Sequence, residues 1–227
     1  MKIKWWQKLL SYIKPINIVQ TSSDYNDYLE LNLVNGRYQL CTEEAIYSYA
    51  DKYDNFKLAF QQIRTEYLNF ENILMLGFGL GSVPFMLEKL FKKHFRMVGI
   101  EIDDEIIYLA SKYVIPDLKS EINMIRADAY SFVYQCSEKF DLIIVDVFQS
   151  DVIPEVFENE DFLEQLSEIL SPTGYILYNR LAFNEEDKAT SKQFFNDHFL
   201  KIFPDATILP TRGNYMLSDK DVFIKAM

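Results

Sequence analysis

The pattern of hydrophobic and polar positions changes near residue 60. From residue 71 onward, short continuous apolar runs alternate with stretches of helical periodicity. The strands that these mostly apolar segments predict cover residues 73–76, 97–100, 122–126, 140–145 and 175–178. Strands in which apolar and polar side chains do not alternate are buried on both faces, as in a parallel sheet covered by helices. The pattern therefore predicts an α/β fold with a doubly wound, mostly parallel sheet.

The segments between these runs predict the covering helices. They lie at residues 82–91, 104–113, 130–136, 160–170 and 185–203. Ser82 is a suitable N-cap for the first of them, and Pro84 fits its first turn, where a missing N–H costs nothing. A strand at 207–209 and a last one at 215–217 or 222–224 are expected to complete the sheet.

A β-hairpin is predicted before the sheet. Two segments with apolar residues at strand-like spacing, 27–34 and 37–41, flank Asn35-Gly36. Asn-Gly between two such runs is the strongest short hairpin signal, because a type I′ turn needs positive φ at both central positions.

Residues 43–64 carry apolar side chains at helical spacing and predict a helix. We therefore expect an N-terminal segment of residues 1–60, with hairpin and helix, and a catalytic domain of residues 61–227. Lysines alternate with aromatic and aliphatic residues in residues 1–15, without a continuous apolar segment. This pattern fits a short amphipathic helix that packs on the protein or a partner, or lies on a membrane.

Charge narrows the partners that the chain can take. Thirty-four acidic against 23 basic residues give a formal net charge of −11. An acidic chain repels phosphate backbones, which argues against nucleic acid as a ligand. The charge suits a small cationic substrate such as an amine, although the same acids also keep a protein in solution. No apolar run is long enough to span a bilayer, so we expect a cytoplasmic protein. The sequence is also compatible with a homo-oligomer.

The first candidate ligand site is the loop Gly77-Phe78-Gly79-Leu80-Gly81, between a predicted strand and helix. Glycines there allow a tight turn and close approach of a ligand to the backbone. Glu101 ends the second strand, where a carboxylate can accept both hydroxyls of a ribose. Dinucleotide enzymes favour Gly or Ala at the position of Ser82, so the spacing favours a nucleoside sulfonium over a pyrophosphate.

Two further acids end predicted strands. Asp128, followed by Ala129, can accept a hydrogen bond from the amino group of an adenine, or it can cap the next helix. Asp146 ends a buried strand, so its carboxylate must face a cleft or be paired. We expect it to meet the acceptor of a transferred group, with Asp151 and Glu155 as further acids near a cationic substrate. No spacing typical of a metal site is present.

These motifs together resemble the spermidine synthase-like branch of the class I methyltransferase-fold superfamily, over residues 27–180. The resemblance implies a Rossmann-like, class I methyltransferase-type sheet with a small N-terminal β-hairpin extension. It implies that Gln39, the glycine loop and Glu101 bind the donor nucleoside. It also implies that Asp128 and Ala129 hold the adenine and that Asp146 helps to deprotonate the attacking amine.

The chain also departs from the aminopropyltransferase pattern. Leu80 stands where an aspartate of the family contacts the donor's aminopropyl amine, and Ser48 stands in place of a tyrosine. A desolvated ammonium without a countercharge is costly. The sequence therefore favours a methyltransferase that uses S-adenosylmethionine and an unknown acceptor. The alternatives are an aminopropyltransferase that uses decarboxylated S-adenosylmethionine and a non-catalytic nucleoside-binding protein.

Overall fold

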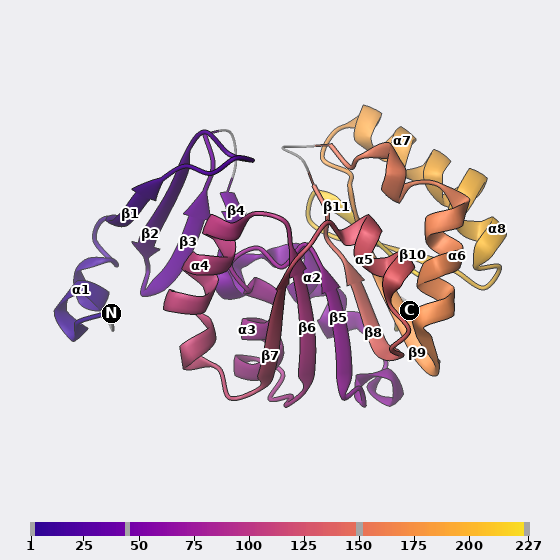
Figure 1. Cartoon of the computed structure of the whole chain (residues 1–227), viewed down its shortest axis with the longest axis horizontal. Helices are drawn as coiled ribbons and strands as arrows, with labels where there is room; N and C mark the ends of the chain where they lie inside the picture. The colour runs from indigo at the N-terminus through magenta and orange to yellow at the C-terminus, as the bar shows by residue number, and fades with distance from the viewer. Residues whose placement is uncertain (1–2, 44–45, 149–151, 225–227) are drawn as a thin grey trace.

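Seven strands form the central sheet of the computed structural model, which describes residues 3–43, 46–148 and 152–224 (Figure 1). In spatial order they run β10-β11-β9-β8-β5-β6-β7. Their bounds are β5 Asn72–Leu76, β6 Arg96–Glu101, β7 Glu121–Arg126, β8 Phe140–Val145, β9 Leu170–Leu181, β10 Thr207–Pro210 and β11 Asn214–Ser218. β11 runs in the opposite direction to the other six strands. The mostly parallel sheet is confirmed, and its strand order reverses between β5 and β8.

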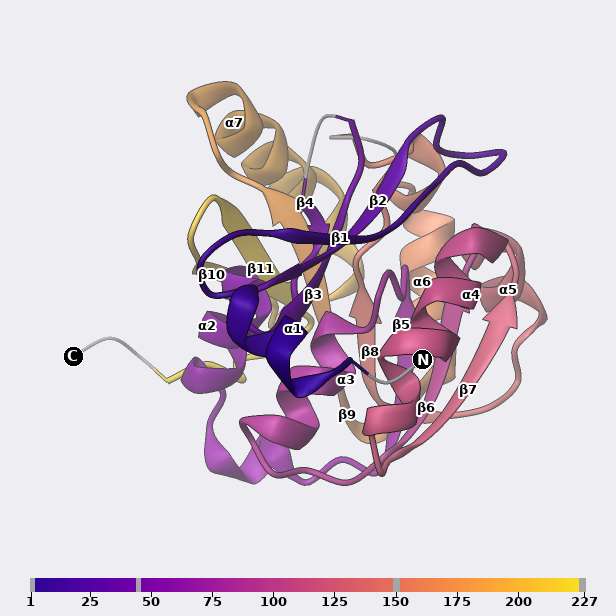
Figure 2. The same ribbon diagram turned by 90° about the vertical axis from the view of Figure 1, so that its left-hand side faces the viewer.

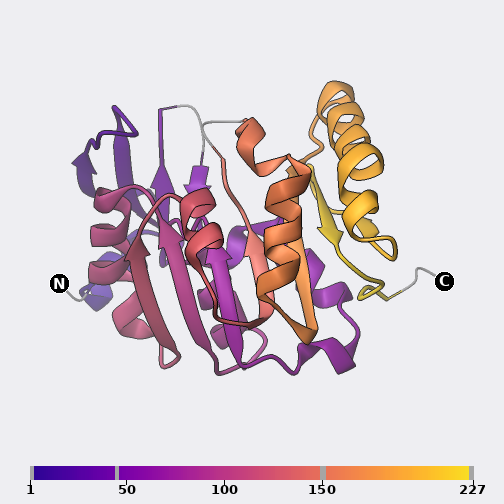
Figure 3. The same ribbon diagram turned by 45° about the vertical axis from the view of Figure 1, so that its right-hand side comes forward.

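Helices cover both faces of this sheet, and each layer buries its own apolar cluster. One layer holds α2 (Asp54–Gln62), α3 (Ser82–Lys89) and α4 (Asp104–Tyr113). The other holds α5 (Ala129–Gln135), α6 (Glu160–Ile169) and α7 (Glu185–Phe194), which continues through a π-helical turn at Phe195–Phe199 into α8 (Leu200–Ile202). Figure 3 shows α5 and α6 in front of the sheet and α2 behind it. Alternate residues of each buried strand face opposite layers, which explains the continuous apolar runs.

The N-terminal part forms a second sheet with the order β1-β2-β3-β4 (Figure 2). Its strands are β1 Ile16–Thr21, β2 Leu29–Val34, β3 Arg37–Cys41 and β4 Ile46–Ser48, all antiparallel to their neighbours. The predicted hairpin is confirmed, because Asn35 and Gly36 have φ values of 50° and 73° between β2 and β3. A short helix, α1 (Trp5–Leu10), precedes this sheet.

The continuous helix expected over residues 43–64 is wrong. Ile46 and Ser48 pair with β3, and a 3₁₀ turn at Ala50–Lys52 precedes α2. Ala50 has φ 44°, which lies outside the range of a right-handed α-helix. The α-helix therefore starts only at Asp54. Pairing at the sheet edge overrides the helical spacing of the apolar side chains.

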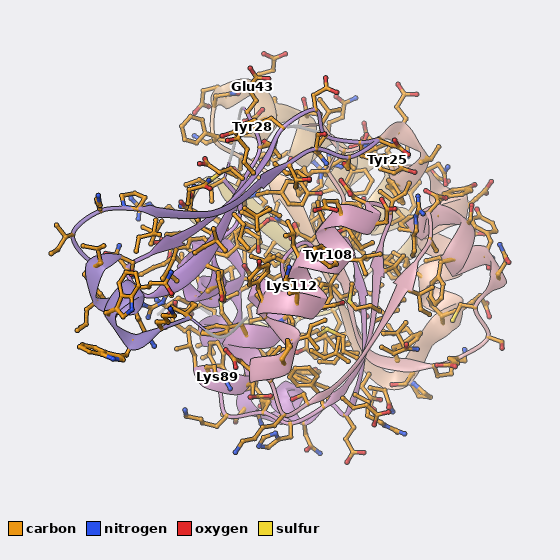
Figure 4. All side chains as sticks on the ribbon, turned by 60° about the vertical axis from the view of Figure 1, so that its left-hand side comes forward. Tyr25, Tyr28, Glu43, Lys89, Tyr108 and Lys112 are labelled. Carbon is orange, nitrogen blue, oxygen red and sulfur yellow. The ribbon has the colours of Figure 1, made fainter. Side chains whose placement is uncertain are left out.

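The two sheets are joined at the start of α4. Asp103 caps this helix by accepting hydrogen bonds from the amides of Glu105 and Ile106. Its second oxygen accepts hydrogen bonds from Ser23 and Asn26 in the β1–β2 connection. Figure 4 shows Tyr25 in this connection, with Tyr108 and Lys112 on the outer side of α4. Among the residues that the structure describes, no helix has the length and apolar character needed to cross a bilayer.

Candidate active site

The glycine loop lies against the ends of β6 and β8. Gly77 has φ 80°, and a Cβ there would lie 2.2 Å from the carbonyl oxygen of Asp146. Only glycine therefore lets β5 turn so close to β8. Gly79, with φ 55°, directs its amide at the carboxylate of Glu101 at 2.9 Å. The loop is held in shape before any ligand binds.

Glu101 is 4% exposed at the end of β6. Besides Gly79, its carboxylate accepts hydrogen bonds from the amides of Ile102 at 2.9 Å and Asp103 at 3.2 Å. Burial raises the pKa of Glu101, and the three amide donors oppose that shift. The observed role of this carboxylate is to tie the glycine loop to β6, and its role toward a ribose remains a prediction.

The helix after the loop begins differently from the prediction. Gly81, with φ 88°, is the N-cap of α3, and Ser82 is the first helical residue. The hydroxyl of Ser82 lies 2.7 Å from that of Ser48 and accepts a hydrogen bond from the amide of Tyr49. Because Ser82 bonds to β4 and the residue after it, it joins the loop to the N-terminal sheet instead of capping α3.

Asp146 follows β8, beside the glycine loop, as predicted from its strand-end position. The hydroxyl of Tyr53 donates to its carboxylate, 3.2 Å from Oδ1 and 3.0 Å from Oδ2. The side-chain amide of Asn179 donates to Oδ1 at 2.8 Å. The Oδ1 atom of Asn179 is buried and has no hydrogen-bond partner within residues 3–43, 46–148 and 152–224. The carboxylate is therefore fixed from two sides, next to an acceptor that is free for a donor group of a ligand.

Burial raises the pKa of Asp146 to about 6. The hydrogen bonds from Asn179 and Tyr53 stabilise the carboxylate and hold the pKa below the value that burial alone would give. Burial also raises the pKa of Tyr53 and of Tyr47 well above the ordinary value, so both hydroxyls stay protonated. A carboxylate with such a pKa is ionised near neutral pH and can accept a proton there.

A cavity of about 170 Å³ opens over these groups. The N-terminal part supplies one wall through β4 and the start of α2, and the strand ends supply the other. Its lining residues are Ile46, Tyr47, Ser48, Tyr53, Asn55, Met75, Gly77, Phe78, Gly79, Ser82, Val83, Asp146, Phe148, Asn179, Leu181 and Asn214. Asp146 is the one carboxylate among these lining residues, and they include no lysine, arginine or histidine. The lining therefore favours a cation over an anion.

Leu80 does not face this cavity. It is 2% exposed and lines a separate hollow of about 510 Å³ behind the loop, together with Tyr38, Phe85 and Tyr113. The Leu80 position therefore offers no countercharge to a ligand at Asp146. Among the lining residues that the structure describes, Asp146 is therefore the group that can balance a positive charge in the cavity.

Asp128, Ala129, Gln39 and Glu155 are not among the residues that line the cavity. Asp128 is exposed and caps α5 through the amide of Ser131 at 2.8 Å, and Ala129 is buried behind it. Gln39 is half-buried on β3. Glu155 is exposed in a 3₁₀ turn, and Asp151 lies outside the described residues. Of the predicted acids, Glu101 bonds the glycine loop and Asp146 lines the cavity.

Two residues that hold Asp146 were missed from the sequence. Asn179 directly follows the apolar run 175–178 in the sequence, so the strand-end rule that selects Asp146 also selects it. Tyr53 lies in the segment expected to be one helix, where its spacing marks a core position. No local signal in the sequence distinguishes it from the neighbouring aromatic residues.

Comparison with known proteins shows which family has a sequence of this kind. The family model for the spermine/spermidine synthase domain matches residues 57–219, more than half of the 227-residue chain. The chain belongs to this family. The match includes the glycine loop, Glu101, Asp128 and Asp146, as the resemblance of the motifs predicts.

The relatives include a polyamine aminopropyltransferase of Vibrio vulnificus, 27% identical over 135 residues. That match covers 57% of this chain and 45% of the relative, so the chain spans about half the length of this curated protein. Among solved structures, a probable spermidine synthase from Corynebacterium glutamicum aligns with a TM-score of 0.69 and 17% identity, covering 92% of this chain and 81% of that one.

Human methyltransferase-like protein 13 in complex with SAH aligns with a TM-score of 0.59 and 19% identity, covering 74% of this chain and 82% of that one. At these identities the structural matches show the fold alone, which is the Rossmann-like class I methyltransferase-type sheet of the prediction. Both kinds of enzyme share this fold, so the choice between aminopropyl and methyl transfer depends on the site.

Proposed function

We propose that this chain is a transferase of the spermidine synthase type, which moves an aminopropyl group from decarboxylated S-adenosylmethionine to a small amine. The sequence favours methyl transfer, whereas the relatives named as polyamine aminopropyltransferases favour its alternative. The observation that carries the proposal is the lining of the cavity, with Asp146 as its carboxylate and the unpaired Oδ1 of Asn179 beside it.

The reaction needs little from the protein besides alignment and a base, because the sulfonium is already activated. The neutral amine nitrogen attacks the aminopropyl carbon bonded to sulfur. The new C–N bond forms as the C–S bond breaks, and sulfur keeps the electron pair as the neutral thioether methylthioadenosine. The acceptor nitrogen passes its excess proton to Asp146, whose carboxylate is held by Tyr53 and Asn179.

The size of the cavity suits the reacting ends of the two substrates. Pockets that enclose a drug-sized ligand measure about 300–1,000 Å³. A cavity of about 170 Å³ accommodates the aminopropyl group and the acceptor nitrogen, and leaves the nucleoside outside it. We infer that the nucleoside lies along the glycine loop and Glu101 toward Asp128 and Ala129, with Gln39 above it. Glu155 and Asp151 remain predictions for the far end of the acceptor.

Methyl transfer is the second candidate, and Leu80 favours it. Decarboxylated S-adenosylmethionine brings an ammonium without its carboxylate, and Leu80 gives that ammonium no countercharge. In the same site a methyl group of S-adenosylmethionine would pass to the acceptor and leave S-adenosylhomocysteine. The two candidates thus share the base and the loop and differ in the thioether that they release.

Calorimetry tests the donor site. We expect decarboxylated S-adenosylmethionine or methylthioadenosine to bind and NAD not to bind. Glu101→Gln should weaken donor binding by about 1–3 kcal/mol, through lost charge-assisted hydrogen bonds.

Glu88→Gln is the matched control, because Glu88 is also buried, at 5% exposed. Its carboxylate likewise accepts hydrogen bonds from backbone amides, those of Lys119 and Ser120. Equal loss of donor affinity in both variants would assign Glu101 to the fold alone. Binding of NAD, with none of an adenosyl thioether or sulfonium, would overturn the donor class.

A further inference from the structure

The short helix α1 is attached to the protein by the face opposite to its apolar one. Ser11, which is 2% exposed, accepts a hydrogen bond from the amide of Gly36 at 2.8 Å through its hydroxyl. The amide of Asn35 donates to the carbonyl oxygen of Ser11 at 2.9 Å. These bonds fix the helix to the β2–β3 turn, at the edge of the molecule (Figures 1 and 2).

The large apolar side chains of this segment are largely exposed to solvent, although the hydroxyl of Tyr12 lies against Gly36. The exposed fractions are 76% for Trp5, 47% for Trp6, 60% for Leu9, 58% for Tyr12 and 83% for Ile13. None of the residues of α1 is buried. Contiguous exposed side chains of this size mark an interaction surface, unlike single exposed apolar residues.

The charge of the segment is opposite to that of the rest of the chain. Residues 1–15 contain four lysines and no acid. Without these four positive charges, the net charge of −11 becomes −15 for residues 16–227. Lys4, Lys8 and Lys14 are all exposed, and the side chain of Lys8 lies against Gly36. Aromatic side chains flanked by lysines are typical of a helix that lies at the boundary of an anionic membrane.

We propose that α1 and residues 11–14 bind the surface of a membrane that contains anionic lipid. Tryptophan rings place an apolar body and a polar N–H at this boundary, while lysines reach the head groups. A second copy of the chain fits less well. A stable protein interface buries about 800 Å² on each partner. The helix α1 has six residues and is only about 9 Å long, which is too small to supply such an area.

The two tryptophans of the chain are Trp5 and Trp6, so tryptophan fluorescence reports on this surface alone. We expect emission to shift to shorter wavelength, and the full chain to sediment with vesicles, when phosphatidylserine is mixed into phosphatidylcholine. Ile13→Ser should weaken this partition by about tenfold, since it removes a large apolar side chain from the lipid boundary. Phe183→Ser is the matched control, because Phe183 is also 83% exposed but precedes α7.

Partition that is equal for vesicles of phosphatidylcholine alone would overturn the requirement for anionic lipid. Absence of partition with either vesicle would overturn the proposal. A different outcome, without lipid, is a wavelength shift that depends on protein concentration and is accompanied by a dimer in sedimentation. If Ile13→Ser abolished both the shift and the dimer, the surface would be assigned to a second copy of the chain.

Discussion

At the scale of single residues, the proposed chemistry depends on Asp146. Its position could be predicted from the sequence, because an acid that ends an apolar strand must face a cleft or a partner. Asn179 could be found by the same rule. Tyr53 could not, because its hydroxyl meets Asp146 across 93 positions of the chain, through a segment whose local spacing predicts a different structure.

Asp146→Asn separates a base from a structural acid. We expect turnover to fall about 10²–10⁴-fold, the usual contribution of a general base. The pKa of Asp146 is raised from 3.8 to about 6, so the native protein binds this proton more tightly than the unfolded chain does. Its contribution to stability is therefore present below pH 4 and is lost as pH rises through 6.

The Asn variant, which is neutral throughout, should then unfold at a higher urea concentration than the wild type at pH 8, and at nearly the same concentration at pH 4. Urea unfolding at both pH values measures this. An Asn variant that keeps full turnover would remove Asp146 from the mechanism.

Tyr53→Phe tests how the pKa of Asp146 is set. The rate kcat/KM should rise with pH up to about 6 in the wild type, as Asp146 ionises. The hydroxyl of Tyr53 stabilises the carboxylate, so its removal should move this limb of the profile to higher pH. A hydrogen bond to a charged group is worth about 1.5–3 kcal/mol, which corresponds to about one to two pH units. A limb that stays at the same pH, with only a lower plateau, would show that Tyr53 acts on substrate alone.

At the scale of elements, the central strands and their helices were predictable because each buried strand is a continuous apolar run. The N-terminal sheet was predictable only at the Asn35-Gly36 turn. β1 and β4 lie at the two edges of this sheet, and β4 has three residues, so neither has a clear pattern of its own. The wrong helix over 43–64 matters for function, because the structure that replaces it places Tyr47 and Tyr53 over the cavity.

Gly77→Ala tests the contact between the loop and β8. A residue other than glycine at positive φ costs about 1–3 kcal/mol, and here the added Cβ would also lie 2.2 Å from the carbonyl oxygen of Asp146. Gly213→Ala is the matched control, because Gly213 also has a positive φ, 78°. A Cβ added there would lie 3.5 Å from its nearest neighbour, a ring atom of Phe183.

Urea unfolding should show a larger loss of stability for Gly77→Ala than for Gly213→Ala, and only the former should reduce turnover. Equal losses in both variants would mean that β8 moves aside at little cost.

At the scale of the whole molecule, two sheets meet at the site. The central sheet supplies Asp146, Glu101 and the glycine loop, and the N-terminal part supplies Tyr47, Ser48 and Tyr53. The division near residue 60 stays a prediction. The hydrogen bonds of Asp103 and of Ser82 cross between the two sheets, so the cavity depends on their docking. Such long-range contacts have no local sequence signal, and for this reason the sequence could predict the strand-end acids but not the wall that the N-terminal part adds to the cavity.

The identity of the released thioether tests the proposed aminopropyl transfer most directly. The protein is incubated with equal amounts of S-adenosylmethionine and its decarboxylated form, with 1,4-diaminobutane as acceptor, and the adenosyl products are measured by mass spectrometry. We predict methylthioadenosine in proportion to the new triamine, and neither product with Asp146→Asn. Formation of S-adenosylhomocysteine with a methylated amine, and no methylthioadenosine, would contradict aminopropyl transfer and establish methyl transfer in its place.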